Sequence, residues 1–119
     1  MKNVILNAPV LGLNGETLVA QTGRTVAGQN GQLQAEQAPI VFGKLALDSI
    51  IRSRTQTDEQ NEILFNLAEK LNNIVKVTTP QTLELSDEEF EAVKAAIDRE
   101  AVIVKARFLQ MVEELNPAV

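Results

Sequence analysis

The chain has 119 residues, of which 45% are hydrophobic and 23% are charged, and this suits one globular domain spanning residues 1–119. It contains no His, Cys, Trp or Tyr, and so lacks the side chains that supply most nucleophiles, most general bases near neutral pH and most soft metal ligands. A phosphate backbone would repel its formal net charge of −5, which argues against a nucleic-acid partner. We therefore expect a protein that is not an enzyme, with no catalytic residue, metal site, cofactor or small-molecule substrate.

The location of the protein is also constrained by its composition. No apolar run approaches the ~18 residues that a membrane-spanning helix needs, so we expect no membrane partner. The lack of Cys fits a reducing compartment, and the N-terminal residues show no clean signal-peptide cleavage site. These features favour the cytoplasm.

Residues 1–20 are expected to form a β-hairpin. Asn14-Gly15 is the dipeptide most typical of a two-residue type I′ turn, because both central positions of that turn need positive φ. Pairing across this turn places Leu11 opposite Leu18 and gives each face an apolar pair. Since a lone hairpin is marginal in water, we expect this one to pack on helices.

Residues 21–38 differ in character from the rest of the chain. They contain three Gly and five Gln, and their only large apolar residues are Val26 and Leu33. Such a segment cannot build a core, so it predicts a flexible loop or an extended arm inserted in the domain. As an arm it would become ordered on a partner, with Val26 and Leu33 as its contact residues.

The middle of the chain predicts a helix followed later by short strands. Apolar spacing indicates a helix over residues 42–54, and Gly43 near its start would let another backbone approach closely. Residues 75–85 contain two short alternating runs around Pro80, which allow a second short hairpin.

Two capping boxes predict helix starts at Thr57 and Ser86. In this pattern the hydroxyl of the first residue and the side chain three positions later satisfy free backbone N–H groups. The acidic residues after Ser86 suit the positive end of the helix dipole, so we assign them to capping rather than to a metal site. They are Asp87, Glu88, Glu89 and Glu91.

Residues 87–115 carry an apolar stripe with no Gly or Pro, so they fit one long helix or two. Polar residues 98–100 followed by the β-branched run 102–104 favour a break, and we predict two helices. In the last segment, apolar residues cover about half of the helix circumference. That helix is either central in the fold or shared with a partner through the residues outside the narrow stripe, which are Val102, Leu109 and Val112.

These elements predict an α+β fold: an N-terminal β-hairpin packed on a bundle of three to four helices, with a second short hairpin near residues 75–85. The same order of elements resembles a class of small phage-encoded proteins of unassigned role. The resemblance is carried by residues 2–10 (KNVILNAPV), 13–15 (LNG), 43–47 (GKLAL), 83–89 (LELSDEE) and 114–115 (EL). It covers most of the chain but not the insert, and it implies viral origin and non-catalytic work.

The function expected from these features is that of a non-catalytic interaction or structural protein. As a virion component, it would contact neighbouring subunits, or further copies of itself, through the extended arm. Two alternatives stay open. One is a phage tail assembly chaperone, and the other is an acidic inhibitor of a host protein. Each would place the chain in the host cytoplasm, and the first expectation would also place it in the virion.

Overall fold

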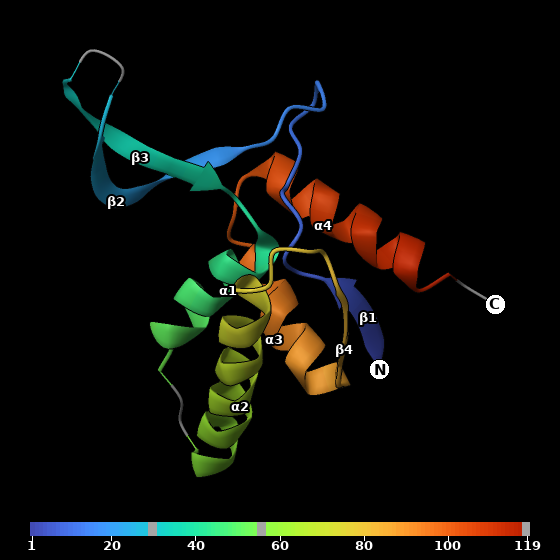
Figure 1. Cartoon of the computed structure of the whole chain (residues 1–119). Coiled ribbons are helices and arrows are strands. Elements are labelled where there is room, and N and C mark those ends of the chain that lie inside the picture. The colour runs from blue at the N-terminus through green and yellow to red at the C-terminus, as the bar shows by residue number, and fades with distance from the viewer. Residues whose placement is uncertain (29–30, 55–56, 118–119) are drawn as a thin grey trace.

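Figure 1 shows the computed structural model, which describes residues 1–28, 31–54 and 57–117. Over these residues the chain has an α+β fold with an N-terminal antiparallel strand pair and four helices, which confirms the predicted class. The strands are β1 (Lys2–Ile5), β2 (Val19–Ala27), β3 (Leu33–Pro39) and β4 (Thr82–Leu85). The helices are α1 (Phe42–Ile51), α2 (Asp58–Val75), α3 (Asp87–Ile97) and α4 (Val102–Leu115).

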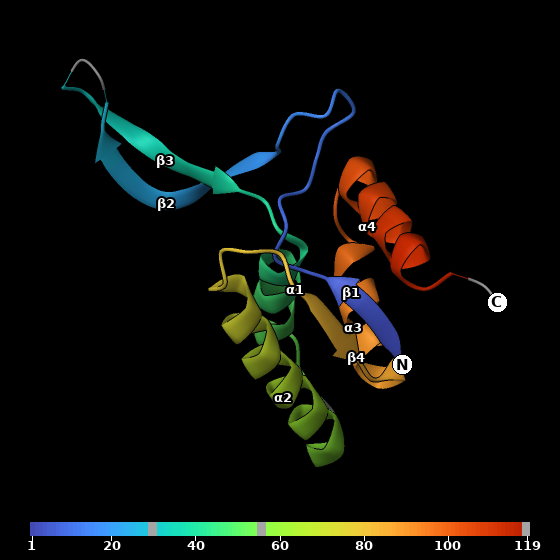
Figure 2. The ribbon, with the colours of Figure 1, turned by 45° about the vertical axis from the view of Figure 1, so that its right-hand side comes forward.

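The described strands form two separate two-stranded antiparallel sheets. In the first, β1 pairs with β4, with Val4 opposite Leu83 and Lys2 opposite Leu85. This pair lies against the helices, as Figure 2 shows, and its Val4 and Leu85 side chains are fully buried. In the second, β2 pairs only with β3, and this ribbon projects away from the helices in both views.

The expected pairing within residues 1–20 is wrong in its register. Leu11 forms an isolated bridge with Thr17 rather than with Leu18, and the Gly12 amide donates to the Glu16 carbonyl at 2.7 Å. A type I′ turn needs positive φ at both central residues, but among the described residues only glycines have it, here Gly15 at +81°. The shift of one residue moves Leu18 to the other face, where it packs against the core.

The second hairpin expected near residues 75–85 is also absent from the described structure. Val75 is the last residue of α2, and the strand at Thr82–Leu85 pairs with β1 from the other end of the sequence. The buried side chain of Asn7 holds the connection between α2 and β4. Its amide donates to the carbonyls of Val77 and Thr79, and its carbonyl accepts from the Gln81 amide. The connection is therefore fixed to the chain that follows β1.

The helix starts follow the local sequence as predicted. Thr57 is the N-cap of α2 and its side chain accepts from the Gln60 amide at 3.1 Å. Ser86 and Glu89 form a complete capping box at the start of α3. The first helix is shorter than expected, since α1 ends at Ile51. The prediction of two helices within residues 87–115 is confirmed, because residues 98–101 separate α3 from α4.

The core is one cluster of aliphatic side chains with three phenylalanines at its centre. The ring of Phe108 on α4 lies 5.4 Å from that of Phe42 on α1, edge to face at 71°. The Phe90 ring on α3 stacks on Phe108 with the ring centroids 6.2 Å apart. Three helices thus meet at Phe108, which is 1% exposed. The largest other side chains with almost no exposure are Leu6, Leu67, Leu71, Leu85 and Ile97.

Gly43 is required by close contact between α1 and the chain after β1. Its amide donates to the Leu6 carbonyl at 2.8 Å, and a Cβ atom would lie 2.9 Å from that carbonyl oxygen and 2.9 Å from the Val75 side chain. We expect Gly43→Ala to lower the free energy of unfolding by about 1–3 kcal/mol, because a backbone oxygen must move. Urea denaturation followed by circular dichroism measures this loss.

The control for this prediction is Lys44→Ala, a change at the next, exposed position of the same helix. It should alter stability by less than about 0.5 kcal/mol, as surface changes usually do. Equal stability of the Gly43→Ala variant and the natural chain would show that α1 does not approach the backbone at Leu6 as closely as described.

None of the described helices combines the length and the apolar character that crossing a membrane requires.

Candidate interaction surfaces

The β2–β3 ribbon, hereafter the arm (residues 19–39), is fixed to the domain at its base. Three backbone bonds hold that base: Val10 to Ile40 at 2.8 Å, Leu18 to Val10 at 2.9 Å and Ile40 to Leu18 at 2.8 Å, each donor named first. Beyond them the arm extends into solvent (Figures 1 and 2). The radius of gyration is 15.7 Å, whereas a compact domain of this length has about 13.5 Å. The segment expected as a loop or an arm is therefore an ordered, projecting β-ribbon.

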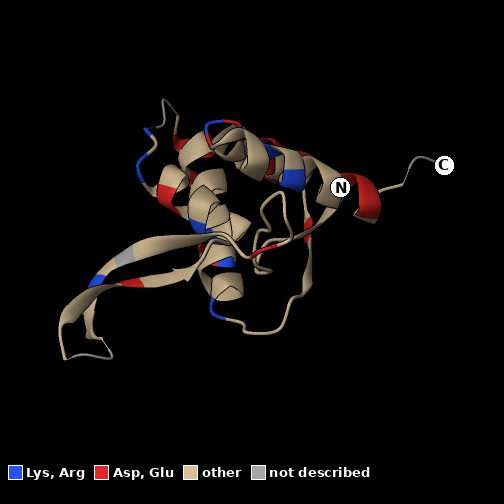
Figure 3. Cartoon of the chain, turned by 90° about the horizontal axis from the view of Figure 1, so that it is seen from above, with Lys and Arg blue, Asp and Glu red and all other residues tan. Residues whose placement is uncertain are grey.

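The arm offers a weakly charged surface on both of its faces. Val26 pairs with Gln34 and Ala27 pairs with Leu33, so the two predicted contact residues point to opposite faces near the tip. Their exposed fractions are 43% for Val26 and 76% for Leu33. Arg24 and Glu36 are the only charged residues of the arm, which therefore has no net charge in a chain of −5. Figure 3 shows how sparse its charges are.

The face of α4 that points away from the core is the second exposed surface. Val102 is 86% exposed and Leu109 is 40% exposed, which places two of the predicted interface residues on it. The side chain of the third, Val112, is half-buried and packs against the core. Val112 follows Phe108 by four residues, so it belongs to the buried stripe of the helix.

A groove of about 790 Å³ between α1, α2 and α3 is the third surface, and the sequence interpretation missed it. Its floor is made of apolar and small side chains, chiefly Ile50, Leu64, Ala92, Ala95 and Ala96. The small residues at helical spacing on α3 are the one sequence signal for it, because they leave room beside the helix. That signal is weak, since alanine is equally common on solvent-facing helix surfaces.

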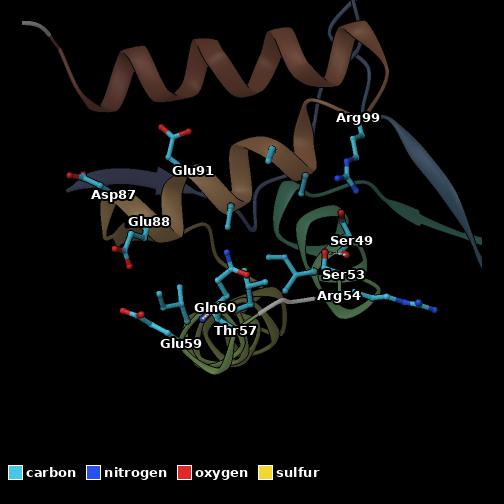
Figure 4. Close-up of a pocket in the computed structure, with 16 residues that line it drawn as sticks. Ser49, Ser53, Arg54, Thr57, Glu59, Gln60, Asp87, Glu88, Glu91 and Arg99 are labelled. Carbon is cyan, nitrogen blue, oxygen red and sulfur yellow. Dashed lines mark hydrogen bonds between the residues drawn. The ribbon is translucent and has the colours of Figure 1, made fainter.

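Charges divide the groove into two ends, as Figure 4 shows. The acidic end is lined by Glu59 from the start of α2 and by Asp87, Glu88 and Glu91 from the start of α3. The basic end is lined by Arg54, which follows α1, and by Arg99, which follows α3. Within the described residues, Asp87 is paired with the N-terminal amine at 3.2 Å, but no ion pair engages Glu91 or Arg99.

The Glu89 carboxylate ties α3 to α2. It accepts from Lys70 Nζ at 2.8 and 2.9 Å through its two oxygens, and also from the Ser86 amide at 3.0 Å. Burial of this carboxylate raises its pKa, but the Lys70 hydrogen bond, the Ser86 amide and the Lys70 charge together outweigh burial. The pKa of Glu89 is therefore lowered from its ordinary value of 4.5. Glu89 thus completes the predicted capping box and, in addition, holds α3 to α2 through Lys70, which was not predicted.

The contact between Glu89 and Lys70 predicts that the stability of the fold depends on pH. Because the folded-state pKa is the lower one, the stabilisation is complete above pH 4.5 and is lost as the pH falls through the folded-state pKa. Glu89→Gln keeps the capping acceptor but not the charge. We expect this variant to be less stable than the natural chain at pH 7, with a difference that shrinks below pH 4.5. Urea titrations at pH 3, 5 and 7 measure it, and a constant difference would contradict the prediction.

Among the described residues, no three His, Cys, Asp or Glu side chains are grouped so that they could hold a metal ion. Comparisons of this chain with protein-family models, with curated protein sequences and with solved structures gave no match.

Proposed function

We propose that this chain is a non-catalytic structural protein of a bacteriophage, which contacts a neighbouring virion subunit through its arm. The observation that carries the proposal is the arm itself, an ordered two-stranded ribbon that projects from the domain and is exposed on both faces. Viral origin rests on the resemblance of the sequence motifs to small phage-encoded proteins.

The physical argument concerns the stability of the arm. A two-stranded ribbon is marginal by itself in water, and it gains stability when another surface covers one face or another strand pairs with an edge. The arm also leaves Leu33 largely and Val26 partly in solvent, so apolar area that could stabilise the arm is not buried within the chain. A neighbouring protein that buries these side chains would supply the contacts that the arm lacks in the isolated chain.

Site-specific cross-linking in assembled particles tests the proposal. A photo-reactive amino acid replaces Leu33 near the tip of the arm, and the matched control carries it in place of Phe65 on α2. The two positions are similarly exposed, at 76% and 61%. We expect position 33 to give a cross-link to a single neighbouring protein in purified phage particles, and position 65 to give none or a weak, mixed product.

The outcomes distinguish the functions considered above. A chain that cross-links to a particle precursor but is absent from finished particles is an assembly chaperone. A cross-link to a host protein alone identifies an inhibitor. Equal cross-linking from positions 33 and 65, or a chain absent from every viral assembly, contradicts the proposal.

A further inference from the structure

The groove and the exposed face of α4 carry complementary patterns. In the groove, Glu91 and Ala95 lie four residues apart on α3, and Arg99 lies four positions further along the chain, in the turn that follows the helix; all three are exposed. On α4, Lys105, Leu109 and Glu113 are spaced in the same way, and all three are exposed as well. Along the chain, the three groove residues are acidic, small and basic, whereas the three α4 residues are basic, large and apolar, and acidic.

Helix-packing geometry brings two such rows together. Residues four apart form a ridge inclined to the helix axis, and two helices that cross at about −50° place these ridges parallel to each other. On α4 the two charges lie eight residues apart, about 12 Å along the helix, whereas on α3 the ridge runs from Glu91 to Ala95 and ends at the turn that carries Arg99. When Leu109 lies in the space beside Ala95, Lys105 is therefore next to Glu91, and Glu113 points toward the basic end of the groove, where Arg99 follows the helix.

We infer that the groove is the docking site for α4 of a second copy of this chain. The charge order selects one orientation, in which the two helices run in the same direction. Glu59 and Glu88 surround the incoming Lys105, and Arg54 stands on the opposite wall from Arg99, within reach of Glu113. Within residues 1–28, 31–54 and 57–117, Lys105 forms one ion pair, with Asp98 at 3.7 Å, and this half-exposed pair is easily exchanged.

The α4 face and the groove lie on different parts of the molecule, so the contact is head to tail. α4 of each copy stays attached to its own α3 while its outer face is free (Figures 1 and 4). A head-to-tail contact does not close in a dimer: each copy that donates its α4 leaves its own groove open for the next copy. The inference therefore predicts a ring or an open chain of copies. It does not rest on the arm.

Two blocking variants test the inference by complementation. Ala95→Trp fills the groove at an exposed position, and Leu109→Glu places a charge on the α4 face. We expect the natural chain to form assemblies larger than a dimer as its concentration rises in sedimentation velocity, and each variant alone to stay monomeric. An equimolar mixture should give a one-to-one dimer and nothing larger, because it contains one free groove and one free α4 face.

A charge exchange tests the orientation. Glu113→Arg and Arg99→Glu should each weaken the association by about tenfold or more, and the double variant should restore it because every interface contains both residues. Circular dichroism and thermal unfolding of each variant verify the fold. If residues 99 and 113 of neighbouring copies are not in contact, the double variant will associate no better than the single variants, and the proposed orientation is wrong.

Leu33→Glu in the arm separates this inference from the proposed function. It should leave the self-association unchanged. If Leu33→Glu abolishes the association while Ala95→Trp and Leu109→Glu do not, copies meet through the arm and the inference is wrong. A natural chain that stays monomeric at all concentrations also overturns it, whereas neither result bears on cross-linking from position 33 to a virion protein.

Discussion

Replacing Phe108 with Ala is expected to lower the free energy of unfolding by about 3–5 kcal/mol, the usual cost of truncating a buried phenylalanine. Phe108 is 1% exposed, and its ring contacts both Phe42 and Phe90. The variant loses the buried area, leaves a cavity where α1, α3 and α4 meet, and removes two aromatic contacts. Since the chain contains no Trp or Tyr, urea denaturation is best followed by far-ultraviolet circular dichroism.

Phe65→Ala is the matched control for this prediction. The same side chain is truncated in this variant, but Phe65 lies on α2, is 61% exposed and is not part of the core cluster. Truncation of Phe65 should change the free energy of unfolding by less than about 0.5 kcal/mol. Similar losses for the two variants would mean that α4 does not pack on the domain through Phe108.

Replacing Asn7 with Asp is expected to destabilise the fold by about 2–4 kcal/mol at pH 7, although the two side chains are nearly identical in shape. The Asn7 amide donates to the carbonyls of Val77 and Thr79 at 3.1 and 2.9 Å. A carboxylate in its place has no hydrogen to donate and faces two carbonyl oxygens at a position that is 7% exposed. The variant should recover part of its stability at low pH, where the protonated acid can donate once.

Asn66→Asp makes the same chemical change on the exposed surface of α2. We expect it to cost less than about 0.5 kcal/mol and to show no recovery in acid. Urea denaturation of both variants at pH 4 and pH 7 provides the comparison. If Asn7→Asp were as stable as Asn66→Asp, the side chain of Asn7 would not hold the connection between α2 and β4.

The features that were predicted correctly depend on neighbouring residues. The caps at Thr57 and Ser86 are formed within three positions of sequence, and the break between α3 and α4 is marked by a local change in polarity. Gly43 was also interpreted correctly, because the missing side chain of a glycine in a helix requires a reason such as close approach.

The features that were missed depend on distant partners. Leu83 and Leu85 indicated a strand, but nothing near them in sequence identifies β1 as its partner. In the arm, Gly23 has φ of +86° where the register of β2 and β3 shifts, and Gly31 has φ of +76° near the tip. These glycines suggested a loop from the sequence, but in the structure Gly23 lies at a β-bulge and Gly31 lies near the turn at the tip. The groove could not be predicted from the sequence, because helix periodicity does not reveal which helix faces remain uncovered after the helices pack.

The pairing of β1 with β4 sets the order in which the chain can fold during its synthesis. About 80 residues separate the two strands, and a ribosome that adds about 5–20 residues per second needs roughly 4–16 s to make them. Throughout that interval β1 lacks its hydrogen-bonding partner, whereas contacts within α1 and α2 are local in sequence and can form earlier. The pairing that joins β1 to the rest of the domain therefore waits until most of the chain has been made, and in the folded molecule the Asn116 side chain secures the same region by accepting from the Asn3 amide and donating to the Asn3 carbonyl.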